Sequence, residues 1–250
     1  MPMGNIFSYL NNIIHNDNQV NTVTNNIPLI TILSDLTCST IGLYITKQII
    51  INHIQYKKFY INSKYKKQII INIVAIIHSL ILTLYGFKKC FFPYNYWYNT
   101  LGSYSIMTFT CSYFIQDLIN LEFKCSNISF IVHHILAILL VFTSIYTKEV
   151  HHLIAPFSLV ELSSVFLNIG YVLQLLNKKN SFIYKLNYVV FMQTFFITRI
   201  IWMPFLIYKF IFYKNISEVK YAEWCITFLA SLNIFWFKYI VQKGIKIIKN

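Results

Sequence analysis

The stretch Ile128-Ser-Phe-Ile-Val-His-His-Ile-Leu-Ala-Ile-Leu-Leu-Val141 decides the fold class of this chain. It is an apolar run that contains two adjacent titratable side chains, His133 and His134. A titratable side chain at bilayer depth costs a few kcal/mol or more, so such residues usually face a protein interior and often mark a substrate path. The stretch therefore predicts a membrane-spanning helix with a polar site on its inner face.

Six further apolar stretches flank this one along the chain. Each approaches or exceeds the length of about 20 residues that a membrane-spanning helix needs. The alternating pattern of a transmembrane barrel does not occur, and helices are the other structure that satisfies its own backbone hydrogen bonds in lipid. We therefore predict an all-α polytopic membrane protein with about seven transmembrane helices, at 29–51, 69–87, 101–120, 128–146, 150–176, 183–212 and 221–241.

The composition favours a membrane protein and argues against nucleic acid as a partner. Of the 250 residues, 56% are hydrophobic and 12% are charged, whereas a soluble domain carries about 25% charged residues. The net charge of +13 comes mainly from lysines in short loops, with no basic stripe interleaved with an aromatic stacking platform. Twelve of these lysines would lie on one side of the membrane and five on the other. The positive-inside rule then predicts that the N-terminus lies outside and the C-terminus inside.

The histidine pair is the centre of the candidate site. Adjacent residues lie about 100° apart on a helix, so at least one of the two imidazoles faces the helix bundle. Imidazole serves as a base, an acid, a nucleophile or a metal ligand, and a structural histidine bonded to a neighbouring helix is the alternative. His78, alone in its span, is expected to be structural. The five cysteines lack CxxC spacing, and neither HxxxH nor HxxHH occurs. We therefore expect no bound metal and no cofactor.

A polar stripe marks the fifth predicted span. Ser164 and Asn168 follow Glu161 at the i+3 and i+7 positions, which share one face of a helix. Glu161 has two alternative partners. It either orients an imidazole of the histidine pair or forms a structural ion pair with Arg199 of the sixth span. Both alternatives place this stripe toward protein or water rather than lipid.

Two further features complete the candidate site. Pro156 and Pro204 lie within the fifth and sixth spans, where each removes a helix hydrogen bond and can kink its helix. Asp117 lies near the inner end of the third span, where it either caps that end or borders the site. We predict a catalytic group of His133, His134 and Glu161 and a substrate-binding group of Asp117, Ser163, Ser164, Asn168 and Arg199.

Four groups of residues carry a family resemblance. They are Tyr113-Phe-Ile-Gln-Asp117, His133-His134, Glu161-Leu-Ser163 with Phe166 and Asn168, and Leu232-Asn-Ile-Phe-Trp-Phe-Lys-Tyr-Ile240. Together they resemble the TLC-domain family, which includes ceramide synthases and translocon-associated membrane proteins. The resemblance covers about residues 65–246 and implies a six-helix, barrel-like core in the endoplasmic reticulum or a related membrane. Residues 29–51 then form an additional N-terminal helix, preceded by a polar tail at 1–28.

Within that family, the sequence is more similar to the proteins linked to phospholipid composition and lipid homeostasis than to ceramide synthases. It departs from the ceramide-synthase signature at Ala137, His151, Val160 and Ser164. The resemblance implies a protein that binds or handles membrane lipids or acyl chains in an intramembrane cavity. One alternative is a sphingosine N-acyltransferase of the ceramide-synthase type, with acyl-CoA as co-substrate. The other is a non-enzymatic cargo or translocon partner.

Overall fold

The computed structural model describes residues 29–56, 63–91, 100–120, 128–147, 151–213 and 220–249, and the predicted tail at 1–28 lies outside them. Within these ranges every regular element is a helix, which confirms the all-α prediction. Five stretches are long and apolar enough to cross a membrane, as the prediction of a polytopic membrane protein requires. They are Tyr65–Phe91, Ile128–Ile145, Ile154–Leu175, Phe182–Tyr208 and Ala222–Ile247.

The helices coincide with the seven predicted spans but extend further at several ends. Five spans are single helices, namely α2 (Leu29–Tyr56), α3 (Ser63–Phe91), α4 (Thr100–Asn120), α5 (Ile128–Thr147) and α10 (Lys220–Lys249). The last of these continues eight residues beyond the predicted end at 241. Lysine and glutamine are good helix formers, and extending an existing helix is easy compared with starting one. The apolar stretches therefore underestimate the lengths of these five helices.

The fifth and sixth predicted spans are each composed of three consecutive helical segments. The fifth comprises α6 (His151–Ser158), the 3₁₀ segment η4 (Leu159–Glu161) and α7 (Leu162–Leu175). The sixth comprises α8 (Phe182–Phe195), the π-helical segment η5 (Phe196–Trp202) and α9 (Met203–Tyr213).

Each change of helix type lies close to one of the two prolines. Pro156 precedes η4 by three residues, and Pro204 follows η5 by two. Proline cannot donate a backbone hydrogen bond, so the regular α-helical ladder is interrupted at these positions. The Nε1–H of Trp202 donates to the backbone oxygen of Pro156 at 3.0 Å, which joins the two irregular regions.

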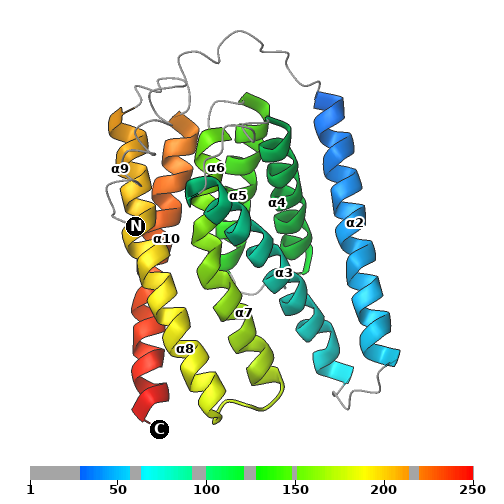
Figure 1. The fold of residues 1–250 in the computed structure, drawn as a ribbon, viewed down its shortest axis with the longest axis vertical. Coiled ribbons are helices and arrows are strands. Elements are labelled where there is room, and N and C mark those ends of the chain that lie inside the picture. Colours follow the sequence, from blue (N-terminus) through cyan, green and yellow to red (C-terminus); the bar gives the residue numbers. More distant parts are fainter. Residues whose placement is uncertain are drawn as a thin grey trace.

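Six of the seven spans form a ring, and the seventh lies outside it. Around the ring α3 contacts α4, α4 contacts α5, α5 contacts α10 and α10 contacts α8 and α9. The spans α8–α9 and α6–α7 then pack against each other, and α6–α7 closes the ring against α3. Figure 1 shows α2 set to one side of this bundle, where it packs chiefly on α4.

Apolar and polar contacts fasten α2 to α4. Ile32 of α2 is almost fully buried in a cluster shared with α4 and α5. The hydroxyl of Tyr104 donates to Asp35 Oδ2 at 2.7 Å, and Lys47 Nζ donates to Asn120 Oδ1 at 2.9 Å. The two polar contacts lie near opposite ends of α4, so together they set the position of α2 along it.

A glycine permits a close approach between α3 and α6. A Cβ atom added to Gly86 would lie 2.6 Å from the backbone oxygen of Ala155 and 3.1 Å from the backbone nitrogen of Leu159. Both neighbours are backbone atoms, which cannot turn aside as a flexible side chain would. The absence of a side chain at this position therefore brings α3 next to the segment that carries Glu161.

Candidate functional site

A cavity of about 120 Å³ lies inside the helix ring and is lined by all six spans of that ring. A single water needs roughly 10–15 Å³ on the same measure, so the cavity has room for several waters or for part of a lipid chain. Along α5 its lining extends from His133 to Ser144, which corresponds to about 16 Å at the helical rise. Leucine, isoleucine, valine, methionine and phenylalanine side chains form most of the wall.

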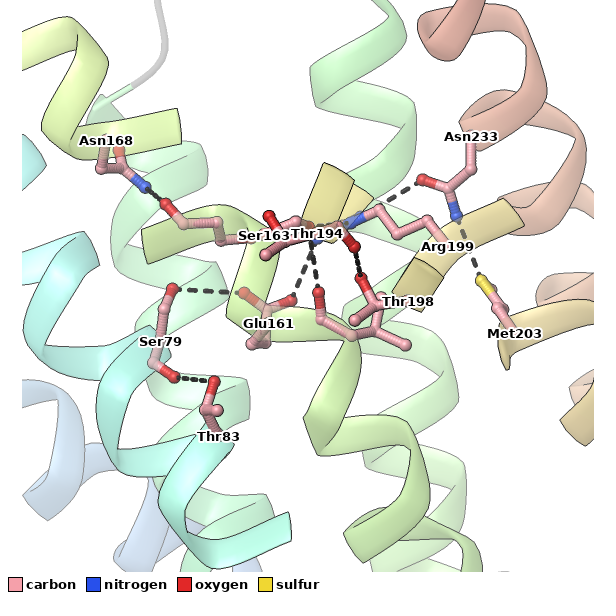
Figure 2. A network of polar contacts seen from close by, with 12 residues as sticks. Ser79, Thr83, Glu161, Ser163, Asn168, Thr194, Thr198, Arg199, Met203 and Asn233 are labelled. Atoms are coloured by element: carbon pink, nitrogen blue, oxygen red, sulfur yellow. Dashed lines mark hydrogen bonds and ion pairs between the residues drawn. The ribbon is translucent and has the colours of Figure 1, made fainter. Parts of the chain in front are cut away.

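Arg199 is the centre of a polar network at this cavity. Its side chain lines the cavity, yet the residue is only 6% exposed. Its Nε–H donates to Ser163 Oγ at 2.8 Å, and Nη2 donates to Ser164 Oγ at 2.9 Å. Its Nη1 donates to Asn233 Oδ1 at 3.2 Å, across to α10. Figure 2 shows Arg199 reaching from the π-helical segment between Ser163 and Asn233.

Glu161 is the counter-charge of this arginine. Its Oε1 lies 3.6 Å from Arg199 Nη2, and its Oε2 accepts from the Ser79 hydroxyl at 3.3 Å. Of the two alternatives that the sequence leaves open for Glu161, the structure contains the ion pair with Arg199. The two charged residues come from η4 and η5, where the helix turn is tighter or wider than in an α-helix. The irregular segments therefore determine the directions in which the two charges point.

His134 forms a second pair with Asp117. Its Nε2 lies 2.8 Å from Asp117 Oδ2, and its Nδ1 lies 2.7 Å from the backbone oxygen of Phe130. A carbonyl oxygen only accepts, so Nδ1 must carry a hydrogen. The contact at Nε2 then holds one proton, either on the imidazole or on the carboxyl group. Both ring nitrogens of His134 are thus engaged within the protein.

His133 faces a different environment from its neighbour. It lines the cavity together with Glu161 and Arg199. Its ring lies 5.3 Å from the Trp236 ring and 5.5 Å from the His134 ring, measured between centroids. Its Nδ1 is buried and has no hydrogen-bond partner among the described residues. At least one nitrogen of this imidazole at the cavity wall is therefore left without a partner in the described part of the protein.

The predicted site residues thus fall into separate groups. Glu161, Ser163, Ser164 and Arg199 share one network, whereas Asp117 and His134 form the other pair. Asn168 joins neither group directly, because its Nδ2 donates to the backbone oxygen of Ser164 in its own helix at 2.8 Å.

Two contributors to the Arg199 network were missed by the sequence reasoning. Asn233 is 1% exposed and accepts from Arg199, while its Nδ2 lies 3.1 Å from Met203 Sδ. An amide within the largely apolar run 224–237 was the available signal for this residue. Ser79, the second, is 2% exposed and adjacent to a histidine, but serine is common enough in membrane helices to give little signal.

His78 packs among aromatic rings. It is 1% exposed and stacks on Tyr113 with ring centroids 3.8 Å apart and an interplanar angle of 13°. Within the part of the chain that the structure describes, neither of its ring nitrogens has a hydrogen-bond partner. The neighbouring rings therefore pack against the His78 imidazole without forming hydrogen bonds to its nitrogens.

Fold and site together define a polytopic membrane protein whose helix ring surrounds an apolar cavity with a charged wall. Residues 68–242 match the family model described as the TLC domain. This match covers well over half of the 250 residues, and the chain belongs to the TLC-domain family.

Two relatives show the same family relationship at low identity. The chain is 27% identical over 150 residues to TLC domain-containing protein 4 A of Dictyostelium discoideum, covering 56% of this chain and 57% of the relative. It is 28% identical over 180 residues to an uncharacterized TLC domain-containing protein of Schizosaccharomyces pombe, covering 66% of this chain and 61% of the relative. The chain thus matches about three-fifths of the length of these relatives.

Proposed function

We propose that this protein acts in lipid homeostasis by holding the acyl chain of a membrane lipid in its intramembrane cavity. The observation that carries the proposal is the apolar cavity inside a ring of membrane helices, with Glu161, Arg199 and His133 on its wall. Binding sites of this kind are mostly apolar and use a few placed polar groups to fix the ligand's orientation. An acyl chain would occupy the apolar length, and the polar end of the lipid would meet the charged wall.

The position of the cavity favours a lipid over a water-soluble ligand. The lining along α5 extends for about 16 Å, which is about half the thickness of the hydrocarbon core of a bilayer. A lipid already inserted in one leaflet can offer an acyl chain of about this length without crossing the membrane. The dimensions of the cavity therefore support the proposal that membrane lipids are its ligands.

Lipids that remain bound during purification test the proposal. Val141 lines the cavity, whereas Leu139 on the same helix is 50% exposed on the outer face of the ring. We expect Val141→Phe to lose most of the lipid that mass spectrometry detects in purified wild-type protein. The matched variant Leu139→Phe should retain it. Equal lipid content in the two folded variants would contradict the proposal, and size-exclusion profiles establish that both are folded.

The acyltransferase alternative rests on His133. Both nitrogens of His134 are engaged by Asp117 and Phe130, which leaves His133 as the imidazole that faces the cavity. In this alternative His133 would act as the base, or as the acyl carrier, with acyl-CoA as co-substrate and a sphingoid base as acceptor. Purified protein incubated with both substrates should then form an N-acyl product that His133→Gln abolishes. Absence of product, beside an active control enzyme, would contradict the alternative.

Cells that express the double variant His133→Ala with His134→Ala address the remaining alternative. Under the lipid proposal their membrane lipid composition differs from that of wild-type cells. An unchanged composition at normal protein level would favour a cargo or translocon partner with a structural histidine pair.

We further propose residence in the endoplasmic reticulum with a lumenal N-terminus and a cytosolic C-terminus. The excess of twelve lysines over five on the predicted inner side supports this orientation. Two glycosylation sequons outside the described residues provide the test, because the proposed orientation puts Asn215 on the lumenal side and Asn127 on the cytosolic side. Glycan attached at Asn127 would contradict the orientation.

A further inference from the structure

The charges around the cavity balance within the protein. The guanidinium of Arg199 has Glu161 as its counter-charge at 3.6 Å. Asp117 and His134 share one proton, so this pair is neutral overall in either proton position. A charge taken into a region of low dielectric is costly unless a partner compensates it. The cavity therefore retains no net charge with which to bind an ionic head group.

The cavity wall does retain hydrogen-bonding capacity. A guanidinium has five N–H groups. The contacts of Arg199 use Nε–H, one N–H of Nη1 toward Asn233, and Nη2 toward Ser164 and Glu161. The second N–H of Nη1 has no partner among the described residues. His133 lines the cavity and contributes Nδ1, a ring nitrogen that has no hydrogen-bond partner among the described residues. An acceptor oxygen on a ligand would satisfy these groups.

We infer that the cavity selects a lipid with a single acyl chain and an uncharged hydrogen-bonding head group, such as an ester, an amide or an alcohol, over its anionic counterparts. This inference rests on the proposed function and adds the chemistry of the head group. The carbonyl or hydroxyl oxygen accepts from the open N–H of Arg199, and His133 provides the second contact. A phosphate or a carboxylate would bring a negative charge into the cavity. Glu161 already neutralises the positive charge of Arg199, so no free positive charge would compensate that anion. On the measure by which one water needs roughly 10–15 Å³, about 120 Å³ is room for part of one chain rather than for the two chains of a phospholipid.

Two probes that differ only in charge test the inference on the wild-type protein. A photoactivatable monoacylglycerol is cross-linked to protein in nanodiscs, and mass spectrometry locates the label. Unlabelled competitor is then added before cross-linking, either monoacylglycerol or the phosphate of that monoacylglycerol with the same acyl chain. We expect the uncharged competitor to be at least about tenfold more effective.

The outcomes separate the inference from the proposed function. Equal or better competition by the phosphate overturns the head-group inference and leaves acyl-chain binding intact. Failure of every probe to label residues of the cavity overturns both.

A charge-removing variant gives an independent test of the same mechanism. Glu161→Gln leaves Arg199 without its counter-charge, so the preference should shift toward the phosphate by about tenfold or more. Glu223→Gln is the matched control, since Glu223 lies in the first turn of α10 and does not line the cavity. An unchanged preference in folded E161Q protein overturns the inference. Should E161Q fail to fold, the competition on the wild type decides alone.

Discussion

Asp117 and Glu161 both place a carboxylate within the helix ring, yet their partners differ in chemical kind. His134, the partner of Asp117, can release its proton and become neutral. Arg199, the partner of Glu161, stays charged at any physiological pH. If Asp117 loses its charge, His134 can become neutral as well. If Glu161 loses its charge, Arg199 remains as an uncompensated cation. This difference separates a pair that can move a proton from a pair that maintains the architecture of the cavity wall.

Removing the charge of Glu161 should have the largest effect on stability. We expect Glu161→Gln to lower the free energy of unfolding by about 3–5 kcal/mol, because it leaves a buried guanidinium uncompensated. The unfolding free energy in mixed detergent micelles measures this loss. The double variant Glu161→Gln with Arg199→Met removes both charges and should recover much of it. Stability of the single variant equal to wild type would show that Arg199 does not depend on this carboxylate.

The sequence predicted the helices better than the pairing between them. Apolar stretches of sufficient length located every span, because lipid leaves the backbone few alternatives. The choice of partner for Glu161 depends on how the fifth and sixth spans rotate about their axes. The 3₁₀ and π-helical segments set that rotation. Pro156 and Pro204 indicated that the helices are interrupted there, but a proline alone does not specify which helix type results.

The histidine pair illustrates the same limit. The spacing predicted that at least one imidazole faces inward, and the structure has both inside the bundle with different neighbours. Whether Asp117 approaches His133 or His134 depends on the relative rotation of α4 and α5. That rotation arises from packing of apolar side chains on both helices, which periodicity alone does not resolve.

A substitution at Asn233 tests whether the contact from α10 helps to hold Arg199 in place. Asn233→Leu leaves an N–H of the guanidinium without its acceptor, and we expect a loss of about 1–2 kcal/mol in the free energy of unfolding. Ile234→Leu, next to it and 61% exposed to the surroundings, is the matched control and should change little. A negligible effect of Asn233→Leu would mean that the contacts from α7 and η4 are sufficient to hold the arginine.

Asp117→Asn tests the adaptable pair and should have a smaller effect than Glu161→Gln. The amide has nearly the same shape as the carboxyl group, and its Nδ2 can donate to Nε2 of a neutral His134. The bond from His134 Nδ1 to the Phe130 backbone oxygen is retained. We expect a loss of about 1 kcal/mol, measured as for Glu161. A loss as large as that of Glu161→Gln would indicate that His134 is held as the charged imidazolium and would remove the distinction between the pairs.

Asn168 should show the smallest effect of the predicted site residues. Its Nδ2 donates to the backbone oxygen of Ser164, four residues earlier in the same helix. That oxygen already belongs to the helix ladder, so removing the side chain leaves no buried charge and no broken contact between helices. We expect Asn168→Ala to change the free energy of unfolding by less than about 0.5 kcal/mol. The better helix propensity of alanine should offset part of any loss caused by removing the amide. A loss above about 1.5 kcal/mol would place Asn168 among the residues that hold Arg199. Asn168 would then act indirectly, by holding Ser164 so that the Ser164 hydroxyl accepts from the Arg199 guanidinium.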